Sequence, residues 1–368
     1  MPPHQQRPAK PDHDAAEPEI HPAQNKRISM RDVARSVGVS VSAVSLAIKN
    51  SPRISPETRR RIQDKIQELG YQPDPMLAAL CQYRRSQSTT SIGAELAWIN
   101  CWPDPQKLRS YREFKLYWEG AGEEARQCGF RLEEFCLAEF KTPARIESIL
   151  RARNIRGILI TPQFGMFDIH WGDFCWDNFC IVRFGHSASN LHAHVVASDQ
   201  LSDGMMAFEN IWNQGYRRIA YVTTRETAAK GNRFSAGVLQ GQLKVGAKSP
   251  LPPLLLADEK NPQRDQKRLA AWLRKAKPDA ILTDLPYLNS LLAKCGCRVP
   301  QDIGLAATSV LDGNARAGID QNSREIGKVA VQMLISLINH NECGIPAICR
   351  ELLIEGRWVD GDTLPRKN

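Results

Sequence analysis

Apolar residues recur at helical spacing between residues 28 and 48. In the first half of this segment they fall on one face of a helix (Met30, Val33, Ala34 and Val37). Gly38 ends that helix with a tight turn, and Ser40 is a good N-terminal cap for a second one, whose apolar positions 44, 47 and 48 share a face. Two short helices joined by a turn that contains glycine predict a helix-turn-helix.

A third helix and a linker follow. Ser55 caps the helix, Pro56 takes its first position and Gly70 closes it. A proline-rich turn and a short helical segment then lead to the polar run 86–91, which is typical of a linker. Residues 1–27 are rich in proline, histidine and glutamine without an apolar period, so they are predicted to form a disordered tail.

From Ile92 onward, short apolar runs alternate with amphipathic segments. The predicted strands are Ala94–Ile99, Gly157–Thr161, Ile181–Phe184, Ile219–Val222, Ala280–Thr283 and Ile303–Ala307. The predicted helices are Tyr111–Cys128, Ala144–Arg153, Leu201–Gln214, Arg264–Lys275 and Asn322–Asn339. This alternation predicts a parallel sheet with helices on both faces. Because about 270 residues is long for one such layer, we expect two α/β lobes.

The composition is that of an ordinary globular protein. Hydrophobic residues make up 42% and charged residues 24%, which excludes a wholly disordered or collagen-like chain. No apolar run approaches the roughly 18 uncharged residues of a membrane span, so an integral membrane protein is excluded as well. The N-terminal residues lack the apolar core of a secretory signal, and the ten scattered cysteines are therefore expected to be reduced thiols in the cytoplasm.

The formal net charge of +9 is concentrated near the N-terminus. Residues 28–85 hold ten Lys and Arg against five Asp and Glu, a net charge of +5, whereas residues 86–368 hold 35 against 31. A local excess of positive charge favours a polyanion as partner. Charge alone is also compatible with a solvated basic surface, but here the charge coincides with the helix-turn-helix pattern.

The helix-turn-helix and its charge together predict double-stranded DNA as a partner. The second helix is then expected to lie in a major groove, with Val41, Ser42 and Leu46 pointing at base edges. Phosphates are expected to be held by hydroxyls and an arginine (Ser29, Ser45, Arg53 and Thr58). The alternative is a three-helix interaction module that binds no DNA.

This segment resembles the lactose-repressor, or LacI-type, family of transcriptional regulators. The matching residues are Arg31-Asp32-Val33-Ala34, Gly38-Val39-Ser40, Val44-Ser45, Ile54-Ser55-Pro56-Glu57-Thr58-Arg59 and Leu69-Gly70-Tyr71-Gln72-Pro73. The resemblance implies a DNA-binding domain at 28–73, with Tyr71 among its DNA contacts, and a hinge helix with linker at 74–90. In the family, a leucine of the hinge helix wedges into the minor groove at the operator centre, and Leu80 matches that leucine.

Two positions depart from the family pattern. The family usually has Arg or His where Leu46 stands and Arg where Ala78 stands. A leucine can touch a thymine methyl but cannot form the bidentate contact of arginine with guanine. The operator preference therefore cannot be carried over from the family.

Residues 91–368 resemble the rest of the family, which is a two-lobed domain similar to periplasmic sugar-binding proteins. The matching segments are Asn213–Ala220, Pro278–Ile281, Arg298–Ile303 and Asp320–Gln321 followed by Ile326–Gly327. The resemblance implies a homodimer whose operator affinity is modulated by a small-molecule effector in the cleft between the lobes. Ligands of such sheets bind at the carboxyl ends of the strands.

Five residues are candidates for contact with that effector. Asn100, Thr161 and Asp284 end predicted strands, Tyr111 opens a helix, and Arg233 matches the effector-binding arginine of the family. Polar groups beside an aromatic face favour a carbohydrate or related metabolite. The family's usual Gly-aromatic-Asp-Asp loop is replaced by Ala307-Thr308-Ser309-Val310. This replacement leaves two alternatives open: the protein binds an unusual effector, or it binds no effector.

Signals for enzymatic chemistry are weak. The segment 120–125 fits a loose dinucleotide fingerprint, but the apolar spacing around it predicts a helix. Cys295 and Cys297, with His192 and His194, lack the ligand spacing of a zinc site. We therefore expect no cofactor, no metal and no enzyme, and predict a cytoplasmic, homodimeric, DNA-binding regulator. The alternative is a small-molecule binding protein whose N-terminal helices bind no DNA.

Overall fold

The computed structural model describes residues 28–48, 50–51, 53–71, 94–140, 142–163, 169–187, 190–229, 233–247, 250–257, 262–313 and 315–367. The chain divides into two compact units, Met1–Pro73 and Asp74–Asn368, which are described separately. The predicted disordered tail, the hinge helix with Leu80 and the linker lie outside the described residues.

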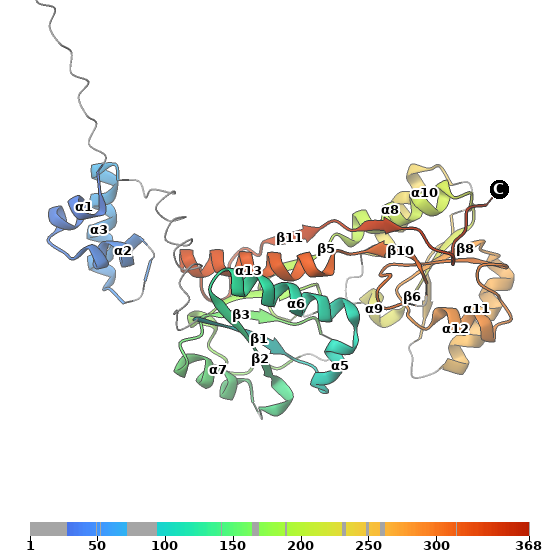
Figure 1. Cartoon of the computed structure of the whole chain (residues 1–368), viewed down its shortest axis with the longest axis horizontal. Coiled ribbons are helices and arrows are strands. Elements are labelled where there is room, and N and C mark those ends of the chain that lie inside the picture. Colours follow the sequence, from blue (N-terminus) through green and yellow to red (C-terminus); the bar gives the residue numbers. More distant parts are fainter. Residues whose placement is uncertain are drawn as a thin grey trace, which may run out of the picture. The chain divides into compact units, whose positions relative to one another are not determined.

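The N-terminal unit consists of three short helices, α1 (Met30–Val37), α2 (Val41–Ile48) and α3 (Pro56–Leu69) (Figure 1). Their ends lie where the sequence predicts them. Gly38 and Gly70 adopt left-handed φ angles of 72° and 62°, and Ser55 Oγ accepts a hydrogen bond from the Thr58 N–H at 3.2 Å. Buried apolar side chains hold the three helices together (Val33, Ala34, Val44, Ala47 and Ile62). The predicted helix-turn-helix is confirmed.

The C-terminal unit contains two sheets of six strands each. The first has the order β11-β5-β4-β3-β1-β2 and is wholly parallel. Its strands are β1 (Ala94–Asn100), β2 (Phe130–Cys136), β3 (Gly157–Ile160), β4 (Cys180–Phe184), β5 (His194–Ser198) and β11 (Glu351–Ile354). Figure 1 shows α13 (Ser323–His340) and α6 (Arg112–Gln127) on one face of this sheet and α7 (Pro143–Ala152) on the other.

The second sheet repeats this plan with the order β12-β10-β9-β8-β6-β7. Its strands are β6 (Ile219–Thr224), β7 (Leu254–Leu256), β8 (Ala280–Thr283), β9 (Gly304–Ala307), β10 (Ala317–Asp320) and the antiparallel β12 (Arg357–Val359). One face packs on α8 (Gln200–Asn213) and α10 (Phe234–Lys244), and the other on α11 (Pro262–Ala276) and α12 (Leu288–Lys294). The described residues add α5 (Pro105–Ser110), α9 (Arg225–Ala229) and the 3-10 turns η1 (Leu137–Glu139) and η2 (Trp176–Asn178).

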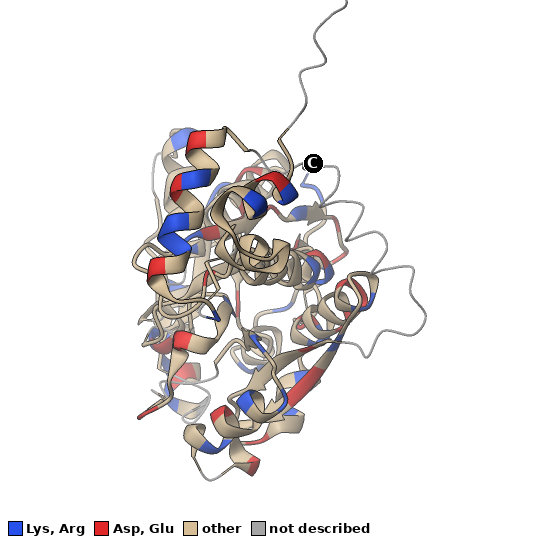
Figure 2. Ribbon diagram, turned by 90° about the vertical axis from the view of Figure 1, so that its left-hand side faces the viewer, with Lys and Arg blue, Asp and Glu red and all other residues tan. Residues whose placement is uncertain are grey.

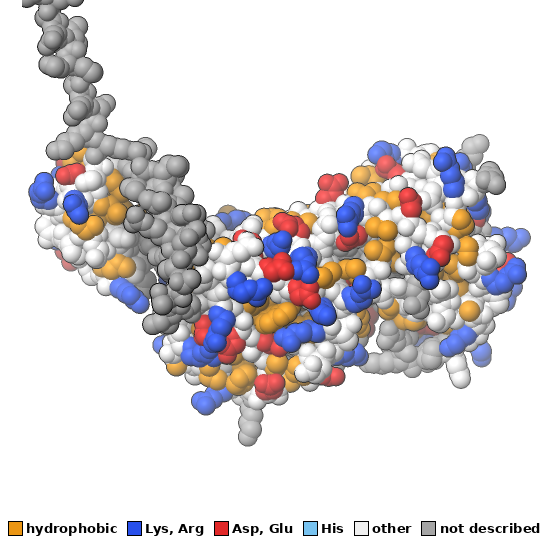
Figure 3. Space-filling model, in the orientation of Figure 1, with side chains coloured by type: hydrophobic (Ala, Val, Ile, Leu, Met, Phe, Trp, Pro, Cys, Tyr) orange, Lys and Arg blue, Asp and Glu red, His pale blue; other side chains and the backbone are white. Residues whose placement is uncertain are grey.

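The chain passes between the two lobes at three places. It leaves the first sheet after β5, returns from β10 into α13, and crosses again from β11 to β12. The six strands expected from the sequence coincide with β1, β3, β4, β6, β8 and β9, so the two-lobed α/β prediction is confirmed. Figure 3 shows basic and acidic side chains interspersed over the visible face of this unit, in keeping with its small net charge.

Glycines allow α6 to cross α13 at very short range. A Cβ atom at Gly120 would overlap the carbonyl oxygen of Arg324, and a Cβ atom at Gly327 would overlap that of Tyr117. Both glycines therefore stand where the two helix backbones touch. The dinucleotide fingerprint around Gly120 is thus part of a helix, as its apolar spacing predicts.

Replacing Gly120 with alanine should destabilise the protein, because backbone atoms of α13 must move to admit the new methyl group. Overpacking of this kind costs about 1–3 kcal/mol, so the melting temperature should fall by several degrees. Gly122→Ala is the matched control: it lies on the same helix, and a Cβ atom there meets only the end of the Arg126 side chain at 3.4 Å. Since alanine favours helices over glycine, the control should melt no lower than the wild type. Equal melting temperatures for the two variants would contradict this account.

Candidate functional site

The exposed face of α2 is apolar and hydroxyl-bearing rather than charged. Val41 is 39% exposed and Ser42 is exposed, while Ser45 and Leu46 are half-buried. Val44 and Ala47, on the opposite face, are buried against the other two helices. The structure therefore leaves the predicted base-contacting positions accessible, on a helix that has no Lys or Arg among residues 41–48.

Hydroxyls mark the N-terminal ends of α1 and α3. Ser29 forms a capping box with Asp32, in which the Ser29 N–H donates to the carboxylate at 2.9 Å. Thr58 Oγ1 accepts a hydrogen bond from Ser55 Oγ at 2.8 Å. Exposed N–H groups at helix starts attract phosphate, so both places suit contact with a DNA backbone.

Arginines surround these helix ends. Arg31, Arg35, Arg53, Arg60 and Arg61 are exposed, and Figure 2 shows Lys and Arg among the residues of the described helices. Arg59 is instead held by the backbone, because its guanidinium donates to the Ser51 carbonyl at 2.7 Å. Tyr71 is half-buried and packs against the core of the unit. The exposed arginines are accessible to phosphates, although Arg61 also donates to the Val37 carbonyl at 3.4 Å and Arg35 pairs with Asp32 at 3.8 Å. Arg59 and Tyr71 support the fold of the unit instead.

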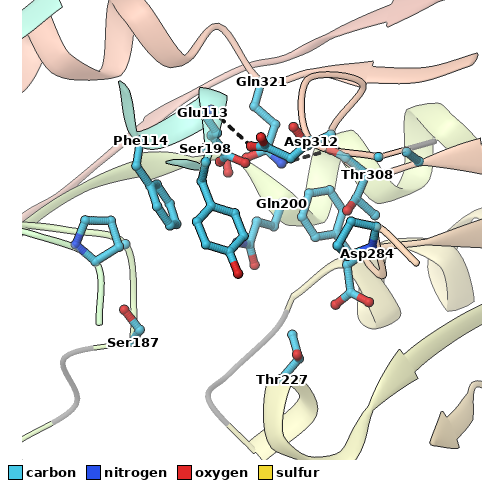
Figure 4. Close-up of a pocket in the computed structure, with 18 of the residues that line it drawn as sticks. Glu113, Phe114, Ser187, Ser198, Gln200, Thr227, Asp284, Thr308, Asp312 and Gln321 are labelled. Atoms are coloured by element: carbon cyan, nitrogen blue, oxygen red, sulfur yellow. Dashed lines mark hydrogen bonds between the residues drawn. The ribbon is translucent and has the colours of Figure 1, made fainter. Parts of the chain in front are cut away.

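A cavity of about 320 Å³ lies between the two lobes of the C-terminal unit. Its walls come from the N-terminal end of α6 and from the segments that follow the carboxyl ends of β3, β4, β5, β8 and β9. Figure 4 shows side chains from both lobes converging on this space. Carboxyl ends of parallel strands are where sheets of this kind bind ligands.

Two of the five predicted effector contacts line the cavity, namely Tyr111 and Asp284. Asn100 and Thr161 do not line it: both are buried and hold neighbouring backbone. Asn100 Nδ2 donates to the Pro105 carbonyl at 3.1 Å, and Thr161 Oγ1 accepts from the Cys101 N–H at 3.4 Å. Arg233 does not line the cavity either, because its guanidinium forms a bidentate ion pair with Glu351 at 3.0 and 3.2 Å.

The sequence analysis did not find Asp312, which connects the lobes. Its Oδ1 atom accepts a hydrogen bond from the Arg112 N–H at 2.6 Å, and its Oδ2 atom accepts one from the Glu113 N–H at 3.0 Å. The residue lies on the loop after β9, whereas the two N–H groups begin α6 of the other lobe. A carboxylate at a helix start satisfies unpaired donors and complements the helix dipole. Asp312 therefore holds the two walls of the cavity together.

Glu113 lies beside this contact and was also missed. Its Oε1 atom accepts a hydrogen bond from the Tyr117 hydroxyl at 3.2 Å. Burial and the nearby Asp312 carboxylate raise the pKa of Glu113 to about 7, against a weaker lowering by Tyr117 and Ser309. Glu113 is therefore partly protonated at neutral pH.

Aromatic side chains form one wall of the cavity. Tyr111, Phe114 and Tyr117 follow one another along the start of α6, with ring centroids 5.6 and 5.7 Å apart, and Phe234 comes from the other lobe. Such a wall suits the flat face of a ring, while the hydroxyl and carboxyl groups elsewhere in the lining suit polar substituents. Within the described ranges, no group of three or more His, Cys, Asp or Glu could hold a metal ion.

A helix-turn-helix joined to a two-lobed domain with a ligand cleft defines a class of transcriptional regulators. Residues 29–74 match the bacterial regulatory proteins of the lacI family, and residues 208–364 match the periplasmic binding protein-like domain. The chain thus joins the DNA-binding domain of the lacI family to a periplasmic binding protein-like domain.

Relatives and solved structures agree with this assignment. The transcriptional regulator KdgR of Bacillus subtilis is 25% identical over 328 residues, which cover 84% of this chain and 91% of KdgR. The regulator GalS of Salmonella typhimurium is 45% identical over 202 residues, 54% of each chain. A structure of the regulator CelR with cellobiose has a TM-score of 0.54 at 19% identity and covers 92% of this chain and all of CelR.

The lac repressor dimer bound to operator and an anti-inducer has a TM-score of 0.52 at 16% identity, and the match covers 92% of this chain and all of the repressor chain. At such identities these structures establish the fold. In the part of the chain that is described, no helix has the length and hydropathy of a membrane span.

Glu113→Gln should make the protein more stable at alkaline pH. Because the folded protein raises the pKa of Glu113 from 4.5 to about 7, it retains a proton that the unfolded chain releases within this interval. Stability therefore falls as the pH rises through the window. The variant, which is always neutral, should melt close to the wild type at about pH 5 and above it at about pH 8.

Asp173→Asn serves as the control, since Asp173 is an exposed acid of the same lobe that does not line the cavity. Its melting curve should follow that of the wild type at every pH. Burial also raises the pKa of Asp203 to about 7. Because Asp203 is unchanged in all three proteins, it adds the same pH dependence of stability to each. If Glu113→Gln and the wild type lost stability in parallel with rising pH, Glu113 would not be the group that titrates.

Proposed function

We propose that this protein is a homodimeric transcriptional repressor of the cytoplasm, whose affinity for operator DNA changes when a small molecule occupies the cavity between its lobes. The observation that carries the proposal is the presence, in one chain, of an accessible helix-turn-helix and of a cavity whose two walls are joined by Asp312. It needs no cofactor and catalyses no reaction. The alternative of a ligand-binding protein with a non-DNA module leaves the basic N-terminal charge without a partner.

DNA recognition is assigned to α2 in a major groove. Val41, Ser42 and Leu46 would contact base edges, with Leu46 suited to a thymine methyl group. Phosphate contacts would come from the helix ends near Ser29 and Thr58, together with Ser45 and the exposed Arg53. Leu80 would wedge into the minor groove at the centre of a two-fold symmetric operator. Tyr71 would help to position the DNA-binding unit against the DNA backbone.

Ligand binding is coupled to DNA binding through the relative position of the lobes. A ligand that contacts both walls favours whichever lobe arrangement brings the walls to the correct distance. In a dimer, that arrangement sets the spacing of the two DNA-binding units, so the ligand shifts the population that fits the operator. Tyr111 and Asp284 are proposed to contact the ligand. The structure of CelR contains bound cellobiose, and this likeness supports a carbohydrate or related metabolite as the effector.

Exposed apolar side chains of the C-terminal unit support the homodimer. Leu201, Leu239 and Leu243 are 46%, 43% and 76% exposed on α8 and α10. A second group lies in and before β11 (Ile345, Ile348, Leu352 and Leu353), with Ile348 81% exposed. The ion pair between Arg233 and Glu351 ties the start of α10 to the start of β11. Large exposed apolar side chains of this kind mark an interface between protein chains.

Val41→Glu should strongly weaken specific operator binding while the protein stays folded. The substitution places a carboxylate where the helix meets the DNA and removes an apolar base contact, for an expected loss of about 1–3 kcal/mol or more. Fluorescence anisotropy with the DNA upstream of the protein's own coding sequence measures the effect. Gln67→Glu adds the same charge at an exposed position of α3 and should weaken binding much less. Equal losses in the two variants would mean that α2 does not lie in the groove.

Leu243→Lys should convert the dimer to a monomer at micromolar concentration, because it puts a charge into an apolar interface. Sedimentation velocity reports the mass directly. Ala271→Lys places the same charge on α11, whose exposed face belongs to the opposite side of the second sheet, and should remain dimeric. A Leu243→Lys protein that stays dimeric would show that α10 does not lie in the interface.

A further inference from the structure

The described lining of the cavity between the lobes carries more acidic than basic side chains. Glu113, Asp284 and Asp312 are among the residues that line it, and the described part of its lining includes no Lys or Arg. Figure 4 shows Glu113 and Asp312 close together, with Asp284 apart from them. Burying carboxylates together costs free energy unless a positive charge compensates them.

Arg233, which acts electrostatically on the cavity residue His186, does not provide that compensation. Arg233 is half-exposed and pairs with both oxygens of Glu351, so the pair contributes almost no net charge. His186 lines the cavity and contacts the same Glu351 at 3.2 Å, and burial lowers its pKa, which favours the neutral ring. Among the described residues, neither Arg233 nor His186 therefore provides a positive charge to Glu113 and Asp312.

The acids concentrate where the lobes meet. Asp312 uses its two oxygens for the N–H groups at the start of α6, which fixes its carboxylate beside Glu113. Each carboxylate oxygen has a second lone pair that can accept another hydrogen bond. Two carboxylates held side by side in a half-buried place form a strong acceptor for an ammonium group, which supplies up to three N–H donors and a full positive charge.

Two further polar groups in the cavity lack a protein partner. Gln163 is only 9% exposed, and its Nε2 atom is buried without a hydrogen bond to any described residue. The same holds for His186 Nδ1. Both residues line the cavity. Buried polar groups nearly always have a hydrogen-bond partner. These two atoms therefore point to a ligand that offers hydroxyl groups to Gln163 and His186.

We propose that the effector of this protein is a compact hydroxylated compound that carries a protonated amine. The ammonium group binds between Glu113 and Asp312, and the hydroxyl groups bind toward Gln163 and His186. The apolar face of the ligand packs on the rings at the start of α6. This inference rests on the proposed function, which makes the cavity the effector site. A volume of about 320 Å³ suits a ligand of this size.

Proton release distinguishes an amine from a neutral ligand. Tyr117, Ser309 and Asp312 are the groups that shift the pKa of Glu113, in addition to its burial. A bound positive charge lowers the pKa of Glu113 from about 7, so binding at neutral pH should release a fraction of a proton to the buffer. A neutral sugar leaves the charges unchanged and should release almost none.

The test is isothermal titration calorimetry of the full-length protein with matched pairs of probes. The amines are glucosamine, galactosamine, mannosamine and 1-amino-1-deoxysorbitol, and their neutral counterparts are glucose, galactose, mannose and sorbitol. At least one amine should bind tenfold or more tightly than its counterpart. Repeating the titration in buffers of different ionisation enthalpy measures the proton release. The inference is overturned if no amine binds more tightly than its neutral counterpart, which includes the case in which nothing binds.

Variants test whether the acids are responsible. Glu113→Gln and Asp312→Asn should each weaken the amine by about tenfold or more, because each removes one charged acceptor, while affecting the neutral counterpart less. Asp173→Asn, an exposed acid outside the cavity, should leave the amine affinity unchanged. Equal losses for amine and neutral probe in Glu113→Gln would mean that the amine does not contact Glu113, and would overturn the assignment.

Operator binding, measured in parallel by anisotropy, separates this inference from the proposed function. If a neutral sugar binds the cavity and changes operator affinity while the amines do not, the proposed function holds and the amine assignment fails. If an amine binds the cavity but the protein binds no operator, the proposed function fails and the ligand class holds.

Discussion

The contact between Asp312 and the first N–H groups of α6 is the interaction on which the ligand site depends. It is the place where one lobe supplies the acceptor and the other supplies the donors. Without it, the start of α6 would present unpaired N–H groups to the cavity, and the two walls would not be joined there. The aromatic wall and Glu113 belong to that same helix start. The geometry of the cavity therefore follows from how firmly α6 is held at its first turn.

The rest of α6 is fixed by close packing within its own lobe. Gly120 and Gly327 let the backbones of α6 and α13 touch, and α13 begins directly after the crossover from β10. Interfaces packed at this density move as rigid bodies rather than deforming. A displacement of α6 relative to Asp312 is therefore accompanied by a displacement of α13, and so by a change at the crossover between the lobes.

Local signals in the sequence predicted the helix-turn-helix and the two-lobed fold well, because caps such as Ser55 and Gly70 act within a few residues. The cavity was harder to predict. Asn100 and Thr161 end strands as expected, yet their side chains turn to neighbouring backbone. Glu113 and Asp312 are about 200 residues apart in the chain and meet only through the fold. The lack of the family's usual acidic loop concealed Asp312, which stands five residues beyond Ala307.

Asp312 binds main-chain donors, and this has a consequence for how the protein can diversify. Any residue except proline at positions 112 and 113 supplies the same two N–H groups, so on the α6 side the joint between the lobes does not depend on side chains. At Glu113, chemical selectivity and mechanical coupling are thus encoded by different atoms, the side-chain carboxyl group and the main-chain N–H group. Substitutions at position 113 can redirect the protein toward another ligand and leave intact the motion by which that ligand is reported to DNA.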